Sequence, residues 1–188
     1  MRYLALTVVA VGLLAVLAGC RIDGEDEPDF ALRVNAGADK EYVDQGGTKW
    51  LPDQEFSAGK TYGAIEGQTV LRTEIKAVQG TKAPQVYLTE RYGMSAYRIV
   101  VPRGDYKVRL HFAETYEGIT GAGQRVFSVK INGQCVLKDL DVFKEAGGFA
   151  EPLVKEFKKI KAPDGKLLIE FSEQVQKPEI NGIEVLAE

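Results

Sequence analysis

The sequence contains few of the residues on which most catalytic and metal centres depend. Its 188 residues include one histidine, two cysteines and one tryptophan. A single histidine leaves no His/Cys cluster with the spacing of a metal site. A Ser-His-Asp arrangement, a phosphate-binding loop and a CxxC pair are also missing. We therefore expect no catalytic residue, no metal site and no cofactor.

An excess of positive charge is missing as well. Lys and Arg total 24 against 27 Asp and Glu, which gives a net charge of −3. No stripe of Lys and Arg is visible along the chain, and a mildly acidic protein has no electrostatic attraction to phosphate. We expect no nucleic-acid partner.

The one long apolar run lies at the N-terminus, from Leu4 to Leu17, and is too short to span a bilayer comfortably. It follows the basic Arg2 and ends in small residues before Cys20. This segment resembles a bacterial lipoprotein signal, which implies cleavage before Cys20 and a lipid on that cysteine. An ordinary secretory signal and a membrane helix are the alternatives. Because Arg21 stands where aspartate is associated with inner-membrane retention, the resemblance implies the outer membrane of the bacterial cell envelope.

Three segments follow from this interpretation. Residues 1–19 form a signal peptide, residues 20–30 form a lipidated N-terminus with an acidic, proline-broken tether, and residues 31–188 form one folded domain. Removal of the signal leaves 169 of the 188 residues, enough for a substantial core. With Cys20 carrying lipid, Cys135 has no partner for a disulfide, so we expect it to be a small buried apolar residue.

Hydrophobic residues alternate with polar ones along most of the folded segment, as in half-buried strands. In the run 105–112, the apolar positions are Tyr106, Val108, Leu110 and Phe112, which places His111 on the outward face. Asn-Gly at 132–133 lies between two such runs and predicts a type I′ hairpin. About ten short strands between residues 32 and 187, with turn signals roughly every 8 to 12 residues, predict an all-β, antiparallel sandwich. One helical turn is expected at 142–146, ended by Gly147.

Seven short motifs occur in a fixed order along the domain. They are Arg33–Gly37, Tyr42–Asp44, Trp50–Asp53, Thr89–Gly93, His111–Tyr116, Arg125–Gln134 and Ile180–Val185. Together they resemble the malectin family of carbohydrate-binding domains, over essentially all of residues 31–188. The resemblance implies a single β-sandwich of jelly-roll (galactose-binding-like) type, with sugar held by loops at one end.

The resemblance also implies which residues contact sugar. Tyr62, Tyr92 and Tyr116 match loop tyrosines of the family and are expected to form an aromatic floor that covers the C–H face of a pyranose. Two positions depart from the family pattern. Glu117 replaces an aromatic residue, and Gln176 aligns with an acidic residue of a late loop, so specificity for the family's α-linked glucose disaccharide is not implied.

The remaining aromatic and acidic residues have structural explanations. Tyr87, Tyr97 and Tyr106 are expected inside strands, and Trp50 is expected to be a buried plug. Glu114 is expected at a strand end, bonded to backbone or to Arg91, with Glu90 in the same polar cluster.

Three functions remain open. The first is a lipid-anchored, non-catalytic protein that binds an oligosaccharide or polysaccharide, for example one containing glucose. The second is a structural or assembly lipoprotein that uses the same loops for a protein partner. The third is a small glycosidase, which requires two suitably spaced carboxyl groups, with Glu90, Glu114 and Glu117 as candidates.

Overall fold

The computed structural model describes residues 30–75 and 78–188. The predicted signal peptide, nearly all of the tether and the lipidation site at Cys20 lie outside these ranges. Within them, no helix is long and apolar enough to cross a membrane. The same ranges contain no group of three or more His, Cys, Asp or Glu side chains placed to hold a metal ion.

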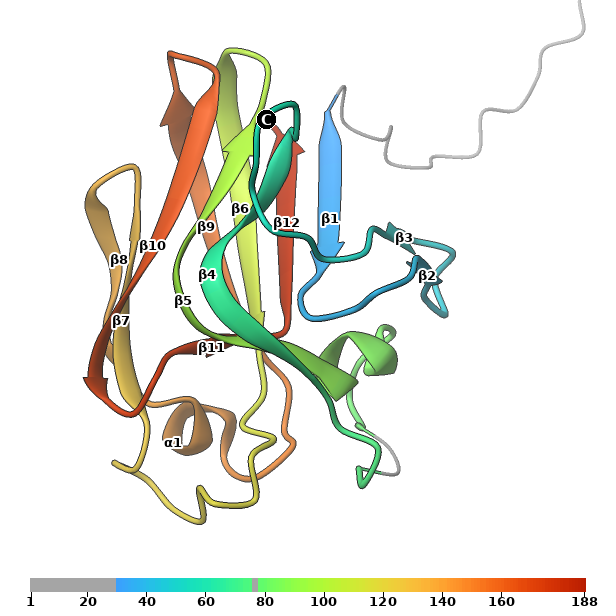
Figure 1. The fold of residues 1–188 in the computed structure, drawn as a ribbon, viewed down its shortest axis with the longest axis vertical. Coiled ribbons are helices and arrows are strands. Elements are labelled where there is room, and N and C mark those ends of the chain that lie inside the picture. The colour runs from blue at the N-terminus through green and yellow to red at the C-terminus, as the bar shows by residue number, and fades with distance from the viewer. Residues whose placement is uncertain (1–29, 76–77) are drawn as a thin grey trace, which may run out of the picture.

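The chain folds into an antiparallel β-sandwich, which confirms the predicted fold class (Figure 1). One sheet has the order β1 (Ala31–Asn35), β12 (Gly182–Ala187), β6 (Gly104–Phe112) and β9 (Leu153–Ala162). The second sheet has the order β4 (Tyr62–Leu71), β5 (Thr89–Val100), β10 (Lys166–Val175), β7 (Val126–Ile131) and β8 (Gln134–Leu140). A short strand, β11 (Glu179–Ile180), pairs with the first part of β5. A hairpin of β2 (Tyr42–Val43) and β3 (Lys49–Trp50), a 3-10 helix η1 (Pro84–Leu88) and α1 (Val142–Ala146) complete the fold.

The core lies between the two sheets, where the predicted alternation is confirmed. Tyr106, Val108, Leu110 and Phe112 of β6 are all buried, and they pack with the inward residues of β5, β7 and β10. The predicted Asn-Gly hairpin is also confirmed, because Asn132 and Gly133 have φ of 50° and 79°. The predicted helical turn is α1, and Gly147 ends it with a φ of 91°.

The side chains of His111 and Tyr87 lie elsewhere than the sequence pattern predicted. His111 is buried, not outward-facing, because Trp50 and Tyr87 cover the outer face of β6 at that point. Its ring bonds the Tyr87 hydroxyl at 2.8 Å and the Glu184 carboxylate at 2.9 Å. Tyr87 is buried as predicted, but in η1 and not in a strand. Trp50 is the expected buried plug, at 2% exposure.

Cys135 is exposed, which contradicts its predicted burial. It lies on β8, an edge strand that pairs only with β7, and the register between these strands shifts beside its partner Lys130. The apolar neighbours Val136 and Leu137 are half-buried, so a local hydrophobic sequence did not decide the orientation of the cysteine.

A buried ion pair fastens the segment after β3 to the second sheet. Asp53 accepts hydrogen bonds from Arg91 Nε at 2.6 Å, Gly37 N–H at 2.8 Å and the Tyr97 hydroxyl at 3.1 Å. The side chains of Arg91 and Asp53 are 5% and 2% exposed. Arg91 also donates to the carbonyls of Glu66 and Gly67 in β4. One pair therefore joins this segment, β4 and β5.

Removing one member of this pair should destabilise the domain strongly. We expect Asp53→Ala to lower the free energy of unfolding by about 3–5 kcal/mol, because it leaves the Arg91 guanidinium buried without its counter-charge. Urea denaturation would measure this loss, with Asp164→Ala on an exposed turn as the control, expected within about 0.5 kcal/mol of wild type. A loss below about 1 kcal/mol for Asp53→Ala would contradict the assignment.

Candidate functional site

A pocket of about 300 Å³ opens at the end of the sandwich that carries α1, remote from the C-terminus (Figure 1). It lies where the end of β4, the start of β5, the loop after β6 and the loop between β10 and β11 meet. Its lining residues are Val70, Arg72, Glu90, Tyr92, Tyr116, Arg125, Gln176 and Lys177. A larger groove, of about 780 Å³, lies at the opposite end between the β7–β8 and β9–β10 turns, but no aromatic side chain lines it. The smaller pocket is therefore the better candidate for a sugar site.

Two tyrosines form the aromatic part of the pocket. Tyr92 is half-buried on β5, and its hydroxyl donates to the Gln68 side chain at 2.5 Å. Tyr116, on the loop after β6, is 48% exposed. A Cβ at Gly118 would lie 2.4 Å from the Tyr116 ring, so the loop needs glycine there for the ring to keep its position. The Arg72 guanidinium lies 5.7 Å from the centre of the same ring, within cation–π distance.

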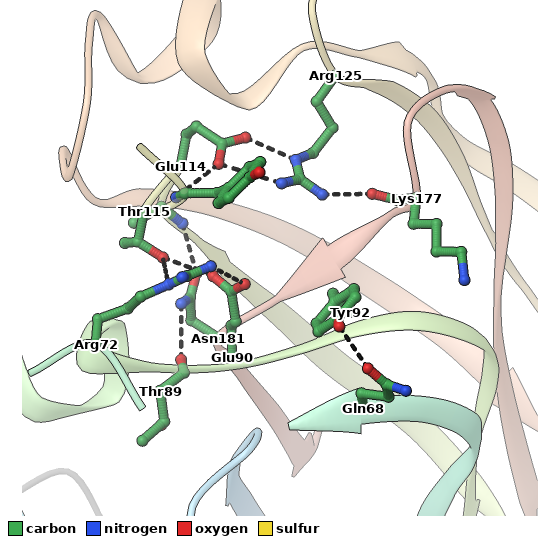
Figure 2. Close-up of polar contacts among 12 residues, drawn as sticks. Gln68, Arg72, Thr89, Glu90, Tyr92, Glu114, Thr115, Arg125, Lys177 and Asn181 are labelled. Carbon is green, nitrogen blue, oxygen red and sulfur yellow. Dashed lines mark hydrogen bonds and ion pairs between the residues drawn. The ribbon is translucent and has the colours of Figure 1, made fainter. Parts of the chain in front are cut away.

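Paired charges make up the floor beneath the rings, and Figure 2 shows how they interlock. Glu90 accepts a hydrogen bond from Arg72 at 2.6 Å and another from the Thr115 hydroxyl at 2.6 Å. Glu114 accepts from Arg125 Nε at 2.7 Å. Both carboxylates are buried, at 1% and 0% exposure, so each requires its arginine partner.

A third carboxyl group, that of Glu179, lies in the same floor without a partner. It is fully buried on β11, opposite Tyr92, and neither of its oxygens has a hydrogen-bond partner among the described residues. Burial, followed by repulsion from Glu90 and Glu114, raises the pKa of Glu179 well above its usual range, and Arg125 opposes only part of this. When Glu179 is neutral, the charges of the floor balance, because the carboxylates of Glu90 and Glu114 pair with the guanidinium groups of Arg72 and Arg125.

The structure brings together three of the five predicted sugar contacts. Tyr92, Tyr116 and Gln176 all line the pocket. Glu117 is exposed beside Tyr116 but is not part of the lining. Gln176 has a φ of 61°, which turns the chain sharply between β10 and β11.

Tyr62 lies away from the other predicted contacts, so the expected floor of three tyrosines is wrong. It pairs with Ile99, whereas Gln68 of the same strand pairs with Tyr92. The step of six residues from Tyr62 to Gln68 puts the backbone positions of the two tyrosines roughly 20 Å apart along the sheet. The Tyr62 hydroxyl instead donates to the Pro52 carbonyl at 2.9 Å, and its ring packs against the core.

The charged lining was only partly foreseen. Glu90 belongs to the polar cluster and Glu114 bonds backbone, accepting from Tyr116 N–H at 3.0 Å, both as predicted. Arg91 is not the partner of Glu114, because adjacent residues of a strand point to opposite faces and Arg91 turns to Asp53. Arg72, Arg125 and Lys177 were missed. Arg125 was the one available signal, since it is the first residue of the motif 125–134.

The unpartnered carboxyl should make stability depend on pH in a definite direction. An unfolded glutamate loses its proton near pH 4.5, while Glu179 in the folded protein keeps its proton to higher pH. Its contribution to the free energy of unfolding therefore falls as pH rises above 4.5. The glutamine of Glu179→Gln does not ionise. We therefore expect the free energy of unfolding of this variant, relative to that of wild type, to rise by about 1–3 kcal/mol between acidic pH and pH 8.

Urea denaturation over this pH range would test the effect of Glu179→Gln. The exposed Glu173→Gln is the matched control for the loss of a carboxyl group elsewhere on the domain. If the free energies of unfolding of Glu179→Gln and wild type changed with pH in parallel, Glu179 would be ionised in the folded state.

Comparison with known proteins agrees with the geometry. Malectin-A of Xenopus laevis is 31% identical over 144 residues, which cover 74% of this chain and 49% of that protein. A probable receptor-like protein kinase of Arabidopsis thaliana, At5g38990, is 28% identical over 165 residues, which cover 77% of this chain and 18% of the kinase. Among solved structures, the β-glucuronidase of Bacteroides uniformis has a TM-score of 0.75 at 26% identity, covering 85% of this chain and 18% of the enzyme.

The chain thus spans about half or less of the length of these proteins. The model of the Malectin domain matches residues 30–183, a range that contains both sheets almost entirely and every residue of the pocket lining. The chain belongs to the malectin domain family.

Proposed function

We propose that this protein binds a glycan, without catalysis, in the pocket between Tyr92 and Tyr116. The observation that carries the proposal is that two tyrosine rings from separate elements line one pocket above a floor of fixed hydrogen-bonding groups. A pyranose has an apolar C–H face and a rim of hydroxyls, so it suits a site with rings on its wall and polar groups around them. The pocket volume of about 300 Å³ fits a short saccharide segment.

The acidic residues of the pocket support binding without hydrolysis. A glycosidase needs one carboxylic acid and one carboxylate free to act on the sugar. Both oxygens of Glu90 are engaged, by Arg72 and Thr115, and both oxygens of Glu114 accept from Arg125. Hydrolysis by the Bacteroides uniformis β-glucuronidase is a property of that whole enzyme, of which this chain covers 18%.

The proposal includes a place in the cell. The N-terminal segment with its Cys20 supports attachment to the bacterial envelope through lipid, with the outer membrane as the expected site. The glycan pocket then works next to a membrane, on a domain held by about ten residues of tether.

Substitution of either ring should weaken glycan binding. On a glycan array followed by calorimetric titration of the domain 30–188, we expect Tyr92→Ala and Tyr116→Ala each to lower affinity at least about tenfold, or 1.4 kcal/mol, because each removes one stacking face. Tyr62→Phe is the matched control and should bind as wild type does, since Tyr62 lies outside the pocket.

Binding that survives both alanine substitutions would overturn this site. Absence of binding to any glycan, together with capture of one defined protein through the same loops, would favour the alternative role as an assembly lipoprotein. Released sugar in the titration cell would favour the glycosidase.

Anchoring has a separate test. In cells that express the full chain, Cys20→Ala should leave the precursor without lipid, because it removes the thiol that the lipid is attached to. Radiolabelled palmitate and membrane fractionation would measure this, with the exposed Cys135→Ala as the control that keeps its label. Unchanged membrane partitioning of Cys20→Ala would contradict a lipoprotein.

A further inference from the structure

Lys177 places an ammonium group in the pocket that no acidic side chain neutralises. Figure 2 shows its side chain extending from the β10–β11 loop toward the Tyr92 strand. Its Nζ has no hydrogen-bond or ion-pair partner within residues 30–75 and 78–188, whereas the two arginines of the lining each have one. A lysine that lines a pocket and lacks a carboxylate partner is available to a ligand.

The backbone around Lys177 is fixed from two sides, which gives the loop that carries the lysine a defined position. Arg125 Nη1 donates to the Lys177 carbonyl at 2.5 Å, and Gly93 N–H donates to the Pro178 carbonyl at 2.8 Å. A Cβ at Gly93 would lie 2.9 Å from Lys177 Cδ and 3.7 Å from its Nζ, so the lysine stem rests directly over a glycine.

The other charges of the pocket cancel. Arg72 is paired with Glu90 and Arg125 with Glu114, both at 2.7 Å or less. Glu179 lies in a fully buried, partnerless site that favours its neutral form. Glu74, 3.9 Å from Arg72, and Glu117 are both exposed and outside the lining. The lining therefore holds three cations, of which Arg72 pairs with Glu90 of the lining and Arg125 with Glu114 beneath it. The uncompensated cation is Lys177.

We propose that the pocket prefers acidic saccharides, with the Lys177 ammonium paired to the carboxylate of a uronic acid whose ring lies against Tyr92 and Tyr116. This inference rests on the proposed glycan site and names the class of sugar that it selects. An ammonium at the edge of a partly open pocket attracts an acidic sugar without burying an ion pair. The gain in affinity over a neutral sugar is therefore modest and falls as salt is added. Lys177 is thus a specificity residue and the tyrosines are the general sugar contacts.

A matched pair of ligands tests this preference. Glucuronic-acid-containing and carboxyl-reduced forms of one disaccharide differ only in replacing the carboxylate by a hydroxymethyl group. In calorimetric titrations of the domain 30–188 at low salt, we expect the acidic form to bind about fivefold more tightly, and the difference to shrink in high salt. Lys177→Gln should remove the difference between the two forms, whereas Lys177→Arg should keep it. Lys144→Gln, an exposed lysine of α1, is the control and should behave as wild type.

The outcomes separate the two proposals. Equal affinity of wild type for the two disaccharides, or a preference that survives Lys177→Gln, would overturn the role of Lys177 and leave the sugar site standing. Absence of binding to either form and to every neutral glycan would overturn both proposals.

Discussion

The pairing of two buried charges at the start of β5 constrains the whole of this domain. Glu90 and Arg91 are adjacent, so their side chains leave opposite faces of the strand, and both are at least 95% buried. Each costs several kcal/mol to bury alone and therefore needs its own counter-charge. Arg91 finds Asp53 from the segment after β3, and Glu90 finds Arg72 from beyond β4. The first pair fastens the sandwich, and the second forms the pocket floor.

The same requirement explains why the pocket is polar, whereas the cluster between the two sheets is apolar. Arg125 satisfies Glu114 and also holds the β10–β11 loop through the Lys177 carbonyl, so one guanidinium links the floor to the rim. Arg72 bonds Glu90 and lies against the Tyr116 ring, which links the floor to the aromatic wall. The groups that a sugar would contact are thus positioned by ion pairs before any ligand binds, which lowers the ordering cost of weak carbohydrate binding.

The fold could be predicted from the sequence because period-two alternation and Asn-Gly at 132–133 report local geometry directly. His111 and Cys135 escaped prediction because their burial is decided by other layers: Trp50 and Tyr87 cover the histidine, and an edge strand leaves the cysteine in solvent. The resemblance to the family singled out three residues that line the pocket, Tyr92, Tyr116 and Gln176. It also placed Tyr62 beside them, which is wrong, because the distance between two tyrosines depends on the register of their strands. Charge partners such as Arg72 and Arg125 depend on contacts between distant strands, which no local pattern encodes.

The proposed function depends on ligand binding between Tyr92 and Tyr116 over the paired charges. An amide chemical-shift titration of the ¹⁵N-labelled domain with glucose- and glucuronate-containing oligosaccharides would locate the ligand, because every backbone amide reports its own environment. Shift changes should gather at residues 68–72, 90–93, 114–118 and 175–179, around the lining of the pocket. Changes gathered at Tyr62 and Arg98, or in the groove between the β7–β8 and β9–β10 turns, would place the sugar at the opposite end of the sandwich and contradict the proposed site.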